Sequence, residues 1–179
     1  MGLHEIVLPE TKPETEWVRG RALQKMSPTR DHSRLQSALI VHLGAWADGR
    51  GEVGVEWQFR LSPPGSIVRP LVPDISYVSN ERLRNIAPDE LQVPRFPPDV
   101  AIEVLSPDDR GPDIEDKISV YLSAGTALVI LVDPKTRTAA LIDPLIRRTL
   151  DETQTLEHAA LPGFSLSLAT LFATLAPPR

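Results

Sequence analysis

Charged side chains occupy positions inside two predicted β-strands where apolar residues would be expected. In the segment DVAIEVL, residues 99–105, side chains alternate between two faces, so Asp99 and Glu103 share one face. In LVPDISYV, residues 71–78, the same alternation assigns Asp74 to a single face. Buried carboxylates are costly unless a partner compensates them. Two neighbouring strands that direct Asp74 and Glu103 to one point therefore indicate a functional site.

The helix predicted after the second strand adds a lysine. Lys117 falls at helical spacing with Ile114, Ile118 and Tyr121, on the face that should pack against the sheet. A lysine on that face requires anionic partners or a route to water. We therefore predict one cluster that joins Lys117 to carboxylates of both strands, with Asp99 at its edge.

Such a cluster has the composition of a metal-dependent phosphodiesterase site. Carboxylates that converge in a cleft raise each other's pKa, and a divalent cation relieves their repulsion. A hard cation such as Mg²⁺ takes oxygen ligands and keeps several waters, which suits a site with few protein ligands. Beside an ammonium group, it can bind a phosphodiester, activate a water and stabilise the charge of the transition state.

Each of these residues also has an ordinary structural explanation. An aspartate after proline, as at Asp74 and Asp99, is common where a chain enters a strand or a turn. Glu103 fits the exposed face of an edge strand, and Lys117 fits a side chain that extends to solvent. The joint placement of all four on compatible faces favours the functional interpretation.

The histidines carry a weaker signal. His32 lies one turn before the apolar stripe of the first helix, and His42 lies on that stripe. We expect both to be packed or surface residues. His158 lies in a predicted terminal strand and indicates no chemistry.

The order of predicted elements indicates a mixed α/β sheet in one domain, residues 16–179, after an irregular arm over residues 1–15. The elements are a hairpin turning at Arg19-Gly20, a helix from Asp31 to about Gly49, strands over 51–62, 71–79 and 99–106, a helix over 113–125 with Asp113 as its cap and Gly125 at its end, an apolar strand over 127–134, a returning strand over 135–143, and a terminal region with one or two edge strands and a short helix.

The composition limits the classes of function. The chain has no cysteine, which excludes disulfides, thiolate metal sites and cysteine nucleophiles and fits a reducing cytosol. No apolar run is long enough to cross a membrane, and no secretory signal is visible, so we expect a cytoplasmic protein. The net charge of −5 argues against a surface covered with nucleic acid, although a local basic patch is compatible with it.

Five short blocks, in this order, resemble the bacterial Uma-type family of restriction endonuclease-like proteins, within the PD-(D/E)XK nuclease superfamily. The blocks are MSP before a helix, PDISYVSNERL, PPDVAIEVLSPDDR, DIEDKISVYLSAG and LVDPKTRTAAL. The likeness extends from about Glu16 to the C-terminal LPGFSLSLATLF. It implies a restriction-endonuclease-like fold with an αβββαβ core, flanking helices and extra hairpins at both ends. It also implies hydrolysis of DNA with Mg²⁺, or Mn²⁺ as a substitute, by a homodimer.

The resemblance also assigns site residues. Asp74 matches the first acidic position of the family, Glu103 the second, and Asp99 the aspartate before it. The superfamily pattern has lysine two residues after the second acid, where this chain has Leu105. In the Uma-type family this lysine is displaced to the following helix, which makes Lys117 its replacement.

Glu16 matches a glutamate near the family's N-terminal hairpin, a weaker correspondence.

Two alternative functions are compatible with the sequence. The first alternative is a catalytically silent protein with the nuclease fold that binds nucleic acid or a protein partner. The second is a glycoside hydrolase with Asp74 and Glu103 as an acid/base pair, which needs neither lysine nor metal.

Overall fold

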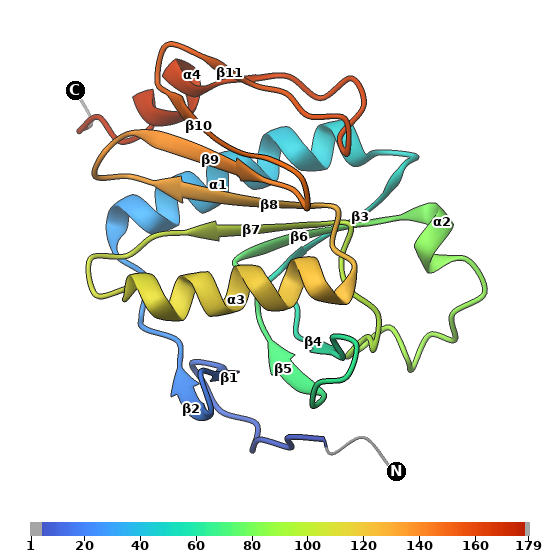
Figure 1. Cartoon of the computed structure of the whole chain (residues 1–179). Coiled ribbons are helices and arrows are strands. Elements are labelled where there is room, and N and C mark those ends of the chain that lie inside the picture. Colours follow the sequence, from blue (N-terminus) through green and yellow to red (C-terminus); the bar gives the residue numbers. More distant parts are fainter. Residues whose placement is uncertain (1–4, 178–179) are drawn as a thin grey trace.

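The structure, a computed structural model, describes residues 5–177 and has a central six-stranded sheet between layers of helices (Figure 1). Its elements are β1 Thr15–Val18, β2 Arg21–Gln24, α1 Arg30–Ala47, β3 Gly51–Val55, β4 Phe59–Leu61, β5 Arg69–Leu71, β6 Ile75–Ser79, α2 Asn80–Leu83, β7 Val100–Val104, α3 Gly111–Ala124, β8 Leu128–Asp133, β9 Thr138–Ile142, β10 Arg147–Asp151, β11 Thr155–Leu156, β12 Leu166–Ser167 and α4 Leu168–Ala173. Within the described residues, no helix combines the length and the apolar composition that a membrane crossing requires.

The central sheet has the strand order β10-β9-β8-β7-β6-β3. Neighbouring strands are antiparallel except β7 and β8, which are parallel and are connected through α3. A parallel pair needs such a crossover because a tight hairpin reverses the chain direction. The elements α1, β3, β6, β7, α3 and β8 form the αβββαβ core, and the hairpins β1–β2 and β9–β10 extend it. This arrangement confirms the predicted fold class.

The two faces of the sheet pack against different helices. Val100 and Ile102 of β7 face the layer formed by α1 and α4, in one hydrophobic cluster. Ala101 faces the opposite way and packs with Ile118 of α3 in a second cluster. The alternation predicted for β7 is therefore confirmed, and it directs Glu103 toward α3, where Lys117 donates to its carboxylate.

Two predicted strands are each broken into two pieces. The prediction of one continuous strand over 51–62 is wrong, because β3 pairs with β6 in the main sheet whereas β4 pairs with β5 in a separate sheet. The chain bends between them at Glu56, which has a positive φ of 49°. The strand predicted over 71–79 is likewise split into β5 and β6. The two bends are adjacent, since the amide of Glu56 donates to the carbonyl of Asp74 at 3.2 Å.

Helix α3 begins earlier than predicted. Its N-cap residue is Arg110, whose side chain makes no capping hydrogen bond, and Pro112 lies in the first turn. Proline is well tolerated there because the first amides of a helix have no intrahelical acceptor. The prediction that Asp113 caps the helix is therefore wrong; Asp113 lies in the first turn. The predicted end is confirmed, because Gly125 is the C-cap with a left-handed φ of 105°.

Candidate active site

The structure brings Asp74, Glu103 and Lys117 together around one cavity of about 300 Å³. Asp74 immediately precedes β6, Glu103 belongs to β7 and Lys117 belongs to α3. All three side chains are buried. The remaining charged and polar groups of this cavity include Glu16 and Lys25, from the β1–β2 hairpin and the residue that follows it, and His32 from α1.

Lys117 and Tyr121 of α3 hold the carboxylate of Glu103. The ammonium Nζ of Lys117 donates to Glu103 Oε2 at 2.8 Å, and the hydroxyl of Tyr121 donates to Glu103 Oε1 at 3.0 Å. Lys117 and Tyr121 are one helical turn apart, so they lie on the same face of α3. The lysine predicted to face the sheet does so, and it is paired there with the acid of the neighbouring strand.

Lys117 also contacts a second carboxylate, that of Glu16. Its Nζ lies 3.1 Å from Glu16 Oε2, and the other oxygen of Glu16 accepts from the amide of Val72 at 2.7 Å. Glu16 is buried with 3% of its surface exposed. One ammonium group therefore joins α3 to the central sheet and to the N-terminal hairpin.

Asp74 has its own set of donors. Its Oδ1 accepts from Lys25 Nζ at 2.7 Å, and its Oδ2 accepts from the amide of Val104 at 2.8 Å. The same Oδ2 lies 3.1 Å from Nε2 of His32. Lys25 additionally donates to the carbonyl of Val72 at 3.0 Å. Lys25 thus fixes both the carboxylate and the backbone just before it.

The fourth predicted residue, Asp99, lies elsewhere. Its Oδ2 accepts from the amide of Ser79 at 2.7 Å, and its Oδ1 accepts from Arg82 Nε at 3.0 Å. Asp99 precedes β7, at the opposite end of that strand from Val104, and it joins this end of the sheet to α2. Its contacts position the start of α2 rather than a group of the cavity.

Burial and charge set the ionisation of the two strand carboxylates in opposite directions. Burial disfavours the charged form of Asp74, but the hydrogen bond from His32 and the charges of Lys25 and Lys117 lower its pKa well below the usual range. For Glu103 burial dominates and raises the pKa to about 7, against the opposing effect of Lys117; the negative charges of Asp74 and Glu16 add to the increase.

The lysines stay charged despite their burial. Burial by itself lowers the pKa of a lysine, but Glu103, Glu16 and Asp74 together raise the pKa of Lys117 above its usual value. Asp74 has the same effect on the pKa of Lys25. The ammonium groups of Lys25 and Lys117 are therefore paired directly with three carboxyl groups of this cavity, those of Glu16, Asp74 and Glu103.

Lys25 and His32 line the cavity but were not predicted as site residues. His32 belongs to the buried stripe of α1 together with Leu35, Leu39 and Leu43. A histidine in register with this stripe is the signal that was available. Lys25 gives no comparable signal, because its partner Asp74 is 49 residues away in the chain.

The donor chemistry of the cavity fits a hard divalent cation. Asp74 and Glu103 present carboxylate oxygens, which such ions prefer. Across residues 5–177, no group of three or more His, Cys, Asp or Glu side chains has the spacing of a metal site. The residues that would hold such an ion are Asp74 and Glu103, together with water, in competition with Lys25 and Lys117, which donate to the same carboxylates.

Comparisons with known proteins identify relatives with nuclease descriptions. The model of the Uma2 family, described as "Putative restriction endonuclease", matches residues 4–169. The crystal structure of a protein from Anabaena variabilis, described as a "putative nuclease" of the DUF820 family, is similar with a TM-score of 0.83 and 27% sequence identity over 94% of this chain and 95% of that chain. A search of curated proteins finds no match. Because the family model spans most of the sequence, this chain belongs to the Uma2 family of restriction endonuclease-like proteins.

Proposed function

We propose that this protein is a Mg²⁺-dependent endonuclease that hydrolyses phosphodiester bonds in DNA. The observation that carries the proposal is the position of Lys117, whose ammonium lies 2.8 Å from Glu103 and 3.1 Å from Glu16 in a cavity that Asp74 also lines. Acidic residues from two adjacent sheet segments, with a charged lysine between carboxylates, combine cation-binding and phosphate-binding groups in one place. The family match supports a nuclease.

In this proposal Asp74 and Glu103 hold the cation. When bound, the ion would polarise the scissile phosphate and lower the pKa of the attacking water. Lys117 and Lys25 then exchange contacts with carboxylates for contacts with phosphate oxygens and with the water. Lys117 positions this water and offsets the charge that develops on the phosphate.

The remaining polar groups have positioning roles. Glu16 and Tyr121 orient the Lys117–Glu103 pair, and His32 orients the carboxylate of Asp74. Asp99 supports the site from a distance, because it fixes the end of the sheet where α2 begins. A cavity that contacts only phosphate groups does not distinguish one DNA sequence from another. We also propose a cytoplasmic location, from the cysteine-free composition, and a homodimer, as the superfamily resemblance implies.

Cleavage of supercoiled plasmid DNA tests this function. The purified protein is incubated with DNA and Mg²⁺, Mn²⁺ or EDTA, and its thermal unfolding is followed with the same additions. We expect nicked and linear DNA with either ion and none with EDTA. Lys117→Ala should abolish the reaction, whereas Lys135→Ala, at an exposed turn, should not change it.

One observation favours the catalytically silent alternative. Both oxygens of Asp74 and of Glu103 already accept hydrogen bonds from protein groups, so the site is complete without an ion. Absence of cleavage, together with unfolding temperatures that do not respond to Mg²⁺ or Mn²⁺, would support a binding protein and contradict the nuclease. A glycoside hydrolase fits less well, because lysines bind both carboxylates. Hydrolysis of a glycoside substrate that survives Lys117→Ala would favour this alternative.

A further inference from the structure

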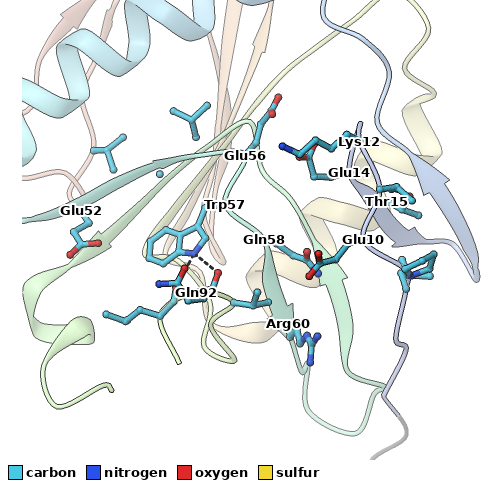
Figure 2. A pocket seen from close by; sticks show the side chains of 18 of the residues that line it. Glu10, Lys12, Glu14, Thr15, Glu52, Glu56, Trp57, Gln58, Arg60 and Gln92 are labelled. Atoms are coloured by element: carbon cyan, nitrogen blue, oxygen red, sulfur yellow. Dashed lines mark hydrogen bonds between the residues drawn. The ribbon is translucent and has the colours of Figure 1, made fainter. Parts of the chain in front are cut away.

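Strand β3 forms one edge of the central sheet, and a second cavity lies along this edge (Figure 2). Most of the residues that line it do not line the candidate active site. This cleft of about 780 Å³ lies between β3, the N-terminal arm over residues 8–15 and the loop over residues 88–93. Glu56 lines both the cleft and the cavity of the candidate active site. The cleft is therefore adjacent to the proposed nuclease site, while nothing in the proposed reaction uses it.

The hydrogen-bond pattern shows which backbone groups of β3 face the cleft. The amide of Asn80 donates to Arg50 at 2.8 Å, and the amide of Glu56 donates to Asp74 at 3.2 Å, so these residues bond toward β6 at the two ends of β3. In an antiparallel pair, bonding residues alternate with residues whose backbone groups point outward. Val53 and Val55 consequently direct their amides and carbonyls to the outer edge. Within residues 5–177 no hydrogen bond to these outward groups is found.

A fixed aromatic side chain forms one wall of the cleft. The indole N–H of Trp57 lies within hydrogen-bonding distance of the carbonyls of Leu91, at 3.1 Å, and Gln92, at 3.3 Å (Figure 2). Trp57 also packs over Gly54, where a Cβ atom would lie 2.7 Å from the indole ring. The glycine permits this close approach, and the hydrogen bonds attach the loop over 88–93 to the edge of the sheet. Trp57 is thus held in position without a bound partner.

The charges along the cleft are mainly acidic. Glu52 and Glu56 flank the outward valines on β3, and the arm contributes Glu10 and Glu14. The basic residues of the lining are Lys12 and Arg60, and Arg60 is already paired with Glu5 at 3.1 Å. A phosphate backbone would be repelled by this lining. A cationic partner is favoured by it.

We propose that the cleft binds an extended, basic segment of a partner polypeptide, which adds a strand to the free edge of β3. Strand addition of this kind obtains affinity from main-chain hydrogen bonds and specificity from side-chain pockets. Val53 and Val55 supply the backbone groups, Trp57 the apolar wall and the glutamates the preference for Lys and Arg. An unprotected sheet edge is otherwise a liability that proteins cover or interrupt.

A second copy of the chain is a poorer occupant. If two β3 strands paired through Val53 of one copy and Val55 of the other, Glu52 would lie opposite Glu56 of the second copy. Like charges directly across a strand pair are destabilising. A basic segment places opposite charges at the same positions.

The test uses a panel of synthetic peptides of about ten residues in which Lys or Arg alternates with Val, Ile or Thr, and a matched panel with Glu in place of the basic residues. Binding to the full chain is followed by calorimetry. Trp57 fluorescence gives a second signal, with Trp57→Phe identifying the contribution of this residue among the three tryptophans. We expect binding by basic peptides only, and weaker binding as salt rises. Equal binding of both panels, or of neither, overturns the proposal.

Two matched variants test the mode of binding. Val55→Pro removes an outward amide and should leave the pairing with β6 intact, because proline is tolerated where an edge-strand N–H faces solvent. Val55→Ala keeps that amide. We expect Val55→Pro to weaken peptide binding by about tenfold or more and Val55→Ala by much less, with similar unfolding midpoints. Binding unchanged by Val55→Pro contradicts strand addition, and a dimer that this variant dissociates identifies a second copy as the occupant instead.

Discussion

The ammonium of Lys117 on α3 lies 3.1 Å from the carboxylate of Glu16 on β1, although the two residues are 101 positions apart in the sequence. The same ammonium binds Glu103 at 2.8 Å. The N-terminal hairpin is therefore part of the candidate active site, and the αβββαβ core alone does not complete it. This relationship makes the ionisation and stability of the site sensitive to residues of three different elements.

Replacement of Lys117 should separate catalysis from stability. Lys117→Met leaves Glu16 and Glu103 buried without their shared ammonium, and loss of one partner of a buried ion pair costs about 3–5 kcal/mol. We expect DNA cleavage to be abolished and the free energy of unfolding in urea to fall by about this amount. The double variant Lys117→Met/Glu16→Gln removes one uncompensated charge and should regain part of the stability while remaining inactive. Cleavage by the well-folded double variant would show that Lys117 has no catalytic role.

Replacement of Asp74 should remove the response to metal. Asp74→Asn keeps the size of the side chain but removes the charge that would bind the cation and that compensates Lys25. We expect no cleavage and no rise of the unfolding temperature with Mg²⁺, in contrast to the wild type. Asp99→Asn is the matched control, because Asp99 contacts Ser79 and Arg82 instead of the cavity. It should keep the metal response and most of the activity; a complete loss of both in a folded protein would place Asp99 in the site.

Glu103 should make the protein less stable as pH rises from about 4.5 to about 7. Its pKa in the folded state is raised to about 7 from an ordinary value of 4.5, so the folded state binds the proton more tightly in this window. Relative to Glu103→Gln, which does not titrate, the wild type should lose up to about 3 kcal/mol between these pH values and no more above them. Urea unfolding of both proteins at pH 5 and pH 8 measures the difference. A difference that does not change with pH would show that Glu103 is ionised throughout.

Lys25 should affect how steeply the free energy of unfolding falls as the pH is lowered. The pKa of Asp74 is lowered from an ordinary value of 3.8, so its ionised form contributes stability that is lost as pH falls below this value. Lys25→Met removes one cause of the lowering, and the stability of the variant should therefore fall less steeply between about pH 5 and pH 2. Lys12→Met, at an exposed lysine of the arm, is the control and should keep the wild-type slope. Identical slopes in all three proteins would show that Lys25 does not stabilise the ionised carboxylate.

Much of the fold could be predicted because it depends on local patterns. The alternation in β7 assigned Glu103 and Ala101 to one face, and the helical spacing of Lys117 assigned it to the side of α3 that packs on the sheet. The bend at Glu56 was not predicted, because alternation continues through it from β3 into β4. Strand β3 ends there because β3 and β4 pair with different strands, and a local sequence pattern does not indicate which strands pair.

The sequence by itself determined the order of the elements of the αβββαβ core, the faces of β7 and α3, and the resemblance that indicated a nuclease, because each follows from residue types at fixed short spacings. Only the tertiary structure decided that Lys25 and His32 surround Asp74, that Glu16 shares Lys117 with Glu103, and that Asp99 pairs with Arg82 instead. These contacts join elements that chain spacing does not relate. A buried charge needs a hydrogen-bonding partner, and the packing of the sheet against its helices determines which partners lie within reach.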